Sequence, residues 1–259
     1  MYYGIQLAAS GALTGLYRTD VLSNNLANLN TAGFKPDFAF TRERDAARVE
    51  DGLFNVPSNE LLEKLGAGAH MAPNAIDYSQ GNLTQTGNPF DFAIRGDGFF
   101  VLRSLADGGA SEVNLTRDGR FAQDSSGRLV SANSGLPVMS EQNRPIELGG
   151  TGAISVAADG TISQNGEVVA KLQLVDIQNR DLLKKGGNGI FRVSSQAFGQ
   201  SIPATGVVEQ RMLEESAVNA ISAMMGVQSA ARSVGTNFTM ISYQDRMMDR
   251  AINTFARIG

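Results

Sequence analysis

The feature that most constrains the fold of this 259-residue chain is a heptad pattern of apolar residues near its C-terminus. The pattern predicts one helix from about Ala217 to Ala256, on the order of 60 Å long at about 1.5 Å per residue. Globular helices average about 11–12 residues, so a single compact domain would not cover this one. Ser216 is the expected N-cap, and Asp245 is the one polar break in the pattern. One seam position holds Met224, Ala231, Phe238 and Ile252, and the other holds Val227, Val234, Ile241, Met248 and Phe255.

A second helical pattern runs from Ile5 to Asn28 near the N-terminus. Its first seam position holds Ile5, Ala12, Thr19 and Leu26, and its second holds Ala8, Gly15, Leu22 and Leu29. Each glycine in this stretch costs a helix about 1 kcal/mol relative to alanine, so the helix is marginal alone. Gly11 and Gly15 would let a partner helix approach closely. The simpler alternative is the buried helix of a compact domain.

The end of this helical pattern, LSNNLANLNTAGFK over residues 22–35, is rich in asparagine. Asn24 and Asn28 form one stripe, and Asn25 lies beside it. Asparagine is a poor helix former because its amide competes for backbone hydrogen bonds, so these amides are expected to pair with other groups. Gly33 can take a left-handed C′ position, with Phe34 folding back on the last turn. An ordinary amphipathic helix with a glycine cap remains the alternative.

Composition excludes several classes of protein. The chain is 42% hydrophobic and 19% charged, which is typical of a folded protein, and its net charge of −4 argues against a nucleic-acid binder. It contains no cysteine, so thiol chemistry and disulfides are excluded. No apolar run reaches the roughly 20 residues that a membrane-spanning helix needs. The N-terminal sequence lacks the basic start and apolar core of a secretory signal peptide.

From about Asp77 to Glu209 the pattern changes to that of β-structure. Phe90, Phe92 and Ile94 alternate with polar or small residues, as in a half-buried strand, and many short apolar segments are separated by turns. The expected turn pairs are Asp107-Gly108, Asp118-Gly119, Asp159-Gly160 and Asn165-Gly166. The expected strands include 129–130, 154–156, 168–169, 172–177 and 190–193. This region is predicted to be an all-β module, either barrel-like or sandwich-like.

No catalytic, cofactor or metal site is expected. The only histidine, His70, falls in a loop-like stretch, and no nucleophile–base motif or calcium-loop spacing occurs. Gly186-Gly187-Asn188-Gly189 precedes a strand, whereas a phosphate cradle needs a helix there. The adjacent carboxylates Glu214 and Glu215 are interpreted as favourable charges at a helix start.

Several stretches resemble one known family, the flagellar rod and hook proteins. LSNNLANLNTAGFK (22–35) resembles the signature at the end of the family's first helix. SQGNLTQTGNPFDFAIRGDGFFVL (79–102) and LTRDGRFAQDSSGRLVSANSGLPV (115–138) resemble two signatures of its central β domain, and MLEESAV (212–218) resembles the start of its last helix. The departures are few: Leu115 replaces an aromatic residue, 133–135 is a variant turn, Ala217 replaces an asparagine, and Val234 stands where tyrosine is common.

The resemblance implies a mixed α+β fold, in which long terminal helices pair in a coiled-coil-like layer and flank a central all-β domain. We expect an N-terminal helix over 1–35, an irregular linker over 36–76, the β domain over 77–209 and the C-terminal helix over 210–259. The resemblance also implies a structural, non-enzymatic subunit of the bacterial flagellar basal-body rod that self-assembles helically to transmit torque. The seam residues named above, the three asparagines, Gly33 and Phe34 are the expected assembly residues.

The implied partners are copies of the chain itself, other rod and hook axial proteins, and the flagellar type III export apparatus, with neither nucleic acid nor membrane insertion involved. The implied location is the periplasmic rod, reached without a cleaved signal peptide. The short stretch from Gly33 to Asp77 favours the proximal rod over a distal rod or hook subunit. A ligand-binding or enzymatic β domain with helical arms is the alternative from another class, and a stand-alone coiled-coil adaptor is a third.

Overall fold

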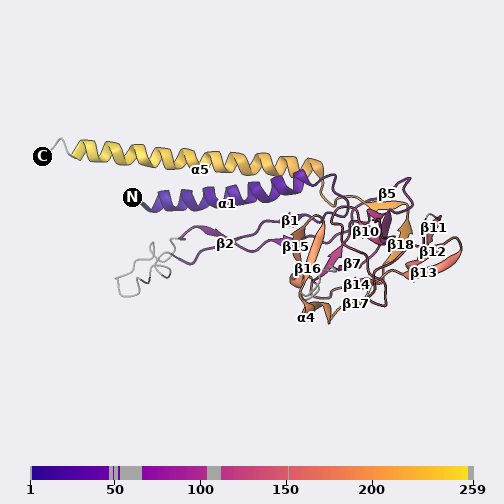
Figure 1. Ribbon diagram of the computed structural model, residues 1–259. Helices are drawn as coiled ribbons and strands as arrows, with labels where there is room; N and C mark the ends of the chain where they lie inside the picture. Colours follow the sequence, from indigo (N-terminus) through magenta and orange to yellow (C-terminus); the bar gives the residue numbers. More distant parts are fainter. Residues whose placement is uncertain are drawn as a thin grey trace. The chain divides into compact units, whose positions relative to one another are not determined.

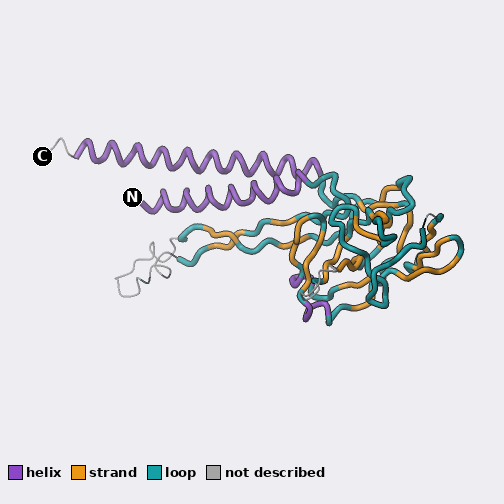
Figure 2. Tube along the Cα trace, in the orientation of Figure 1, coloured by secondary structure: helices purple, strands orange, loops and turns teal. Residues whose placement is uncertain are grey.

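The computed structural model describes residues 2–46, 49, 52, 66–103, 112–150 and 152–255 (Figure 1). The chain forms two compact units. The helical unit contains Met1–Ala27, Asp37–Asp77 and Asn219–Gly259, and the β unit contains 28–36 and 78–218. Two long terminal helices and a β-rich middle of the chain confirm the mixed α+β fold class (Figure 2).

The helical unit is built on α1 (Tyr2–Ala27) and α5 (Ala220–Phe255), which lie side by side (Figure 1). The N-cap of α5 differs from the prediction. Asn219 caps it, because its Oδ1 accepts a hydrogen bond from the backbone N of Ser222 at 3.0 Å. The Ser216 hydroxyl instead accepts a hydrogen bond from the backbone N of Val218 at 3.3 Å, so it stabilises the turn before the helix. Residues 256–259, where the helix was expected to end, lie outside the described part.

Helix α1 ends at Ala27, before the expected glycine stop. Gly33 does have the predicted left-handed backbone, with φ of +64°. It belongs to the β unit, however, and a Cβ atom at this position would collide with the backbone of Arg117. Its conformation therefore serves a close approach of two backbones rather than a helix cap.

The described residues of the stretch 37–77, which belongs to the helical unit, form two antiparallel ladders where we expected an irregular linker. Strand β1 (Asp37–Phe38) pairs with β4 (Ala75–Ile76), and β2 (Thr41–Glu43) pairs with β3 (Ala69–Met71). The partner strands are far apart in sequence and very short, so local patterns could not reveal them. His70 lies exposed on β3 opposite Arg42, not in a loop.

The β unit contains a six-stranded sheet with the strand order β15-β16-β8-β7-β14-β17. A three-stranded sheet, β11-β12-β13, and the two-stranded ladders β9-β10, β6-β18 and β5-β19 complete it. The strand bounds are β5 Leu83–Gln85, β6 Phe92–Arg95, β7 Phe99–Arg103, β8 Val113–Thr116, β9 Phe121–Gln123, β10 Leu129–Ser131, β11 Ile154–Val156, β12 Thr161–Gln164, β13 Glu167–Lys171, β14 Leu174–Asp176, β15 Lys184–Gly187, β16 Ile190–Val193, β17 Ile202–Pro203, β18 Val207–Gln210 and β19 Met212–Glu214.

The turns and strands of the β unit match most of the sequence pattern. Asn165 and Gly166, with φ of 54° and 89°, make the predicted tight turn between β12 and β13. The pair 107–108 lies outside the described residues. Two short helices interrupt the predicted all-β region: η1 (Arg180–Leu182) and α4 (Ser195–Phe198), the latter capped by the Ser194 hydroxyl.

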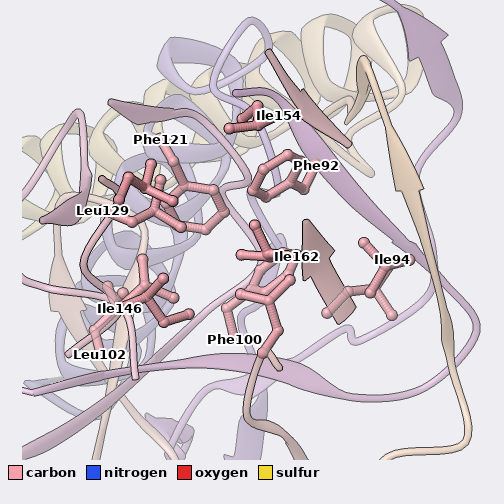
Figure 3. Packing of buried hydrophobic residues seen from close by; sticks show 13 residues of the cluster. Phe92, Ile94, Phe100, Leu102, Phe121, Leu129, Ile146, Ile154 and Ile162 are labelled. Atoms are coloured by element: carbon pink, nitrogen blue, oxygen red, sulfur yellow. The ribbon is translucent and has the colours of Figure 1, made fainter. Parts of the chain in front are cut away.

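The core of the β unit is a cluster of aliphatic and aromatic side chains (Figure 3). Phe100 and Phe121 meet edge to face with ring centroids 5.1 Å apart, and Phe92 packs against Phe121 at 5.5 Å. Strand β6 is buried on both faces, because Phe92, Ala93 and Ile94 are each at most 1% exposed. The predicted half-buried strand is therefore buried on both faces from Phe92 to Ile94, which a small residue such as Ala93 permits, and only Arg95 at its end is exposed. The cluster also contains Leu102, Leu129, Val138, Ile146, Leu148, Ile154, Ile162, Leu172 and Val208.

Candidate functional site

Side chains of α5 fill the glycine gaps of α1 within the helical unit. A Cβ atom at Gly15 would lie 2.7 Å from Cγ2 of Val234, and one at Gly11 would lie 3.0 Å from Oδ1 of Asn237. Gly4 faces the side chain of Gln244 in the same way, and Leu22 in turn packs over Gly226. The N-terminal part of α1 thus packs against the C-terminal part of α5, so the two helices are antiparallel. The predicted close approach of a helix at Gly11 and Gly15 is confirmed.

The two predicted seam positions of α5 differ in burial. Val234 is 7% exposed, and Val227, Ile241 and Met248, at the same heptad position, are half-buried. The residues of the other position, Met224, Ala231, Phe238 and Ile252, are exposed. The small residues Ala223 and Ala230, at 6% and 5% exposure, are buried instead. Our heptad frame favoured large side chains, whereas a glycine-rich partner helix packs closely against small ones. The side chain of Phe255 lies outside the described part.

The predicted seam residues of α1 also differ in burial. Ala8 and Ala12 are buried at 8% and 4% exposure. Ile5, Leu22 and Leu26 are half-buried, and so is Leu29, which follows the helix and belongs to the β unit. Their role in assembly stays a prediction.

The three asparagines occupy different environments. Asn25 is 4% exposed, and its side-chain amide bonds the backbone of Asp37. Asn24 is exposed. Asn28 is half-buried, and its Oδ1 accepts a hydrogen bond from the Thr31 hydroxyl at 3.1 Å.

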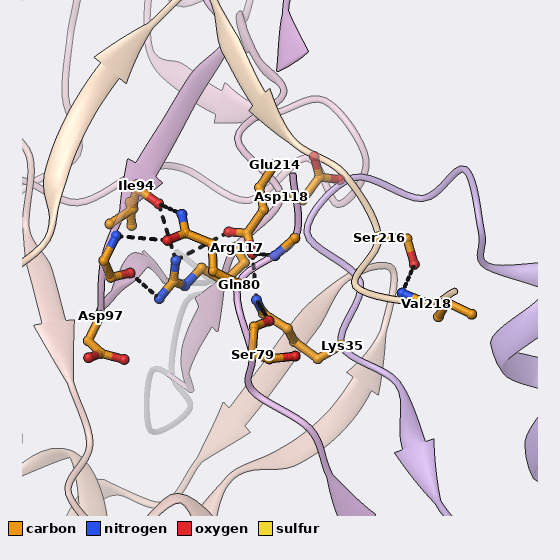
Figure 4. A network of polar contacts seen from close by, with 12 residues as sticks. Lys35, Ser79, Gln80, Ile94, Asp97, Arg117, Asp118, Glu214, Ser216 and Val218 are labelled. Atoms are coloured by element: carbon orange, nitrogen blue, oxygen red, sulfur yellow. Dashed lines mark hydrogen bonds and ion pairs between the residues drawn. The ribbon is translucent and has the colours of Figure 1, made fainter. Parts of the chain in front are cut away.

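A buried charged cluster, the Glu214 clasp, lies within the β unit and consists of Lys35, Arg117 and Glu214 (Figure 4). The exposed fractions of these side chains are 1%, 4% and 1%. Lys35 Nζ lies 2.5 Å from Oε1 of Glu214, and Arg117 Nη1 lies 3.2 Å from Oε2. The backbone N of Gly81 donates a third hydrogen bond to Oε1 at 3.0 Å. One carboxylate therefore holds three segments that are far apart in the sequence.

Two further contacts hold the Arg117 guanidinium within the β unit. Its Nη2 donates to the carbonyl O of Gly96 at 2.8 Å, and its guanidinium lies over the ring of Phe99, 5.2 Å from the centroid. Burial lowers the pKa of Arg117 from its ordinary value, while the charge of Glu214 acts in the opposite direction. An arginine pKa begins so far above neutrality that the side chain stays charged, so a buried counter-charge is required.

Backbone hydrogen bonds surround the clasp. Gly33 N donates to Glu214 O at 2.7 Å, and Ala217 N donates to Phe34 O at 3.1 Å. Lys185 Nζ donates to the carbonyl O of Lys35 at 2.6 Å and lies 4.4 Å from the centroid of the Phe34 ring. The segment that follows α1 and the segment that precedes α5 are thus bonded to each other inside the β unit.

Sequence reasoning missed this cluster. We interpreted Glu214 as a charge at a helix start, but it ends strand β19 and is buried. That interpretation was wrong because Glu214 is paired with Lys35 and Arg117, which lie 179 and 97 residues away in the sequence. The only sequence signal was the position of Lys35 at the end of the N-terminal signature.

Comparison with known proteins identifies the family. Residues 5–35 match the family profile described as "Flagella basal body rod protein", and 93–170 match that of the "Flagellar hook protein FlgE/F/G D1 domain". The flagellar basal-body rod protein FlgF of Escherichia coli (strain K12) is 32% identical to this chain over 97% of each sequence. The chain belongs to the flagellar basal-body rod protein family. FlgG of Buchnera aphidicola subsp. Schizaphis graminum is 32% identical (89% of this chain, 91% of the relative), and FlgF of Rhizobium meliloti (strain 1021) 31% (98% of each).

Members of the basal-body rod protein family are structural subunits. The predicted family and the predicted structural, non-enzymatic role are therefore confirmed, and the enzymatic alternative is set aside. Two structural findings accompany this identity. Among the described residues, no three His, Asp or Glu side chains gather in a way that could hold a metal ion. No helix in the described part combines the length and the hydrophobicity that crossing a membrane requires.

Proposed function

We propose that this rod subunit assembles with copies of itself and with other axial proteins through an apolar stripe on α5. The stripe is defined by Ile221, Met224, Phe238 and Ile252, which recur at heptad spacing and whose exposed fractions run from 52% to 70%. Exposed apolar surface of this extent on one helix is typical of a protein–protein interface. This exposure, on a helix whose small-residue face already packs on α1, is the observation that carries the proposal.

The stripe suits a helical assembly. A contact between two different surfaces of identical subunits does not close on itself, so it generates a filament with many equivalent contacts. The half-buried side chains of α1 and α5 stabilise the helix pair within one subunit. The stripe stabilises the contact between subunits. Asn24 and Asn28 are proposed to set the register between neighbouring subunits.

The test is Phe238→Asp. A charge buried without a partner in an apolar interface is costly, so the variant is expected to fold but not to enter the rod. Its matched control is Val168→Asp, at a position that is 71% exposed on β13 of the β unit. The control is expected to swim normally. Normal motility and normal rod content in Phe238→Asp would overturn the proposal.

The finer placement of the subunit is also proposed. The short stretch from Gly33 to Asp77 favours the proximal rod over the distal rod or hook, and immunogold labelling of purified basal bodies tests this.

Export through the flagellar type III apparatus into the periplasmic rod predicts that the assembled protein keeps the sequence that begins MYYGIQ. Mass spectrometry of the protein from basal bodies tests that point. Limited proteolysis tests the expected domain boundaries at 35/36, 76/77 and 209/210 against those of the two compact units, at 27/28, 36/37, 77/78 and 218/219.

A further inference from the structure

We propose that Glu214 couples two segments of the chain, 28–36 and 211–218, so that they dock on the rest of the β unit and leave it together. The first segment follows α1 and the second precedes α5. Without coupling, each segment would open on its own, as loops and chain ends commonly do. With it, neither segment is released while the other stays bound.

The contacts between the two segments carry this inference (Figure 4). Lys35 Nζ bonds Oε1 of Glu214 at 2.5 Å, and Gly33 N bonds the carbonyl O of Glu214 at 2.7 Å. In the other direction, Ala217 N donates a hydrogen bond to the carbonyl O of Phe34 at 3.1 Å. Each segment therefore supplies hydrogen-bond partners that the other needs.

Burial makes a half-docked state unfavourable. If the second segment left alone, Lys35 would lose the carboxylate that it bonds at 2.5 Å while staying at a position that is 1% exposed. If the first segment left alone, Glu214 would lose the ammonium of Lys35 at a position that is 1% exposed. A buried charge that loses its partner is strongly destabilising, so both segments are expected to open in one step.

Coupling of this kind suits a subunit that carries torque, because a load on either segment is then shared by both. That benefit rests on the proposed function, but the coupling itself does not. It can be measured on the free full-length chain, and a failure there would leave the rod assembly tests unaffected.

Hydrogen exchange of the full chain provides the test, with two backbone amides as reporters. The Phe34 amide, bonded to the carbonyl O of Thr31 at 3.3 Å, reports the first segment. The Glu215 amide, bonded to the carbonyl O of Asn82 at 2.8 Å, reports the second. The perturbation is Lys185→Met, which removes a hydrogen bond and a cation–π contact to the first segment.

In the parent chain, Lys185→Met is expected to speed exchange at both Phe34 and Glu215 by about 10-fold, the equivalent of losing one charge-assisted hydrogen bond. In a Glu214→Gln background, where the backbone bonds between the segments remain, the same substitution is expected to speed exchange much less at Glu215 than at Phe34. Lys184→Met, at the exposed neighbouring position, is the matched control and is expected to change neither amide.

Two results would overturn the proposal. One is faster exchange at Phe34 without any change at Glu215 in the parent chain, because the segments would then open independently. The other is a Glu215 amide that responds to Lys185→Met as strongly after Glu214→Gln as before it, because the Glu214 carboxylate would then not couple the segments. If circular dichroism shows that Glu214→Gln does not fold, Lys35→Met breaks the same link from the other side and decides the matter.

Discussion

The side-chain amide of Asn25 forms two hydrogen bonds with the backbone of Asp37. Its Nδ2 donates to the carbonyl O at 2.8 Å, and its Oδ1 accepts from the backbone N at 3.0 Å. Asn25 lies on α1 and is 4% exposed, while Asp37 begins β1. The amide thus pairs with both backbone groups of Asp37, as a neighbouring strand would, and joins the first ladder to the helix.

Asn25→Asp is expected to loosen this junction. The substitution keeps the acceptor but places an oxygen against the carbonyl of Asp37, so one buried hydrogen bond is lost at a cost of about 1–3 kcal/mol. Hydrogen exchange at the Asp37 amide should become markedly faster, and swimming should be impaired. Asn24→Asp, at the exposed neighbouring position, is the control for exchange at the Asp37 amide. An unchanged Asp37 amide in Asn25→Asp would contradict the role given to this pair.

The asparagine stretch shows what sequence can and cannot predict. Pairing of the amides was predicted from the poor helix propensity of asparagine, and Asn25 does pair with backbone. Which of the three amides is buried depends on strand β1, which contacts α1, and no local pattern contains that information. The same holds for Gly33. Its left-handed backbone conformation was predicted, but the close approach of the Arg117 backbone, which requires a glycine there, was not.

Periodicity predicted the two helices and most strands, because burial of one face leaves a repeat in the sequence. It did not predict the strand order of the six-stranded sheet or the Glu214 clasp. Both depend on contacts between distant residues, such as Val101 with Leu115 or Lys35 with Glu214. The heptad frame of α5 located the helix but placed large residues where Ala223 and Ala230 are buried.

Gly15→Ala is expected to weaken the α1–α5 pair, although alanine favours the helix itself by about 1 kcal/mol. The new methyl group would lie 2.7 Å from Val234 Cγ2, so either the stiff β-branched side chain of Val234 or the helices themselves must shift. Val234→Ala removes that atom, and the double variant should regain the thermal stability that Gly15→Ala loses. Gly235→Ala, with no atom within 4 Å of the added carbon, should only stabilise α5. Equal melting temperatures for Gly15→Ala and the parent chain would argue against close packing here.

Ile241→Asp and Phe238→Asp are expected to fail in different ways. Ile241 is half-buried at the heptad position of Val234, so a carboxylate there should disrupt the helix pair within one subunit. Phe238 is 52% exposed, so its replacement should spare that pair and block only assembly. Circular dichroism of the purified variants separates the outcomes. Equal helix content in both variants would show that Ile241 does not stabilise the pair.

Asn24 and Asn28 give the last prediction. If they were only weak helix formers in solvent, their replacement by alanine would stabilise the helix by a few tenths of a kcal/mol each and leave function unchanged. If they pair with groups of neighbouring subunits, removal leaves buried partners unsatisfied at about 1–3 kcal/mol each. Repeated in every subunit, that loss should give a rod that is absent or breaks under shear.

We expect the second outcome, and more strongly for Asn28, which is half-buried and already bonds Thr31, than for Asn24. The double alanine variant is scored for swimming and for basal bodies that survive extraction. The single variants then divide the effect between the two positions, and Gly235→Ala serves as a helix-stabilising control outside the asparagine stretch. Wild-type swimming together with intact basal bodies in the double variant would mean that these amides play no part in assembly.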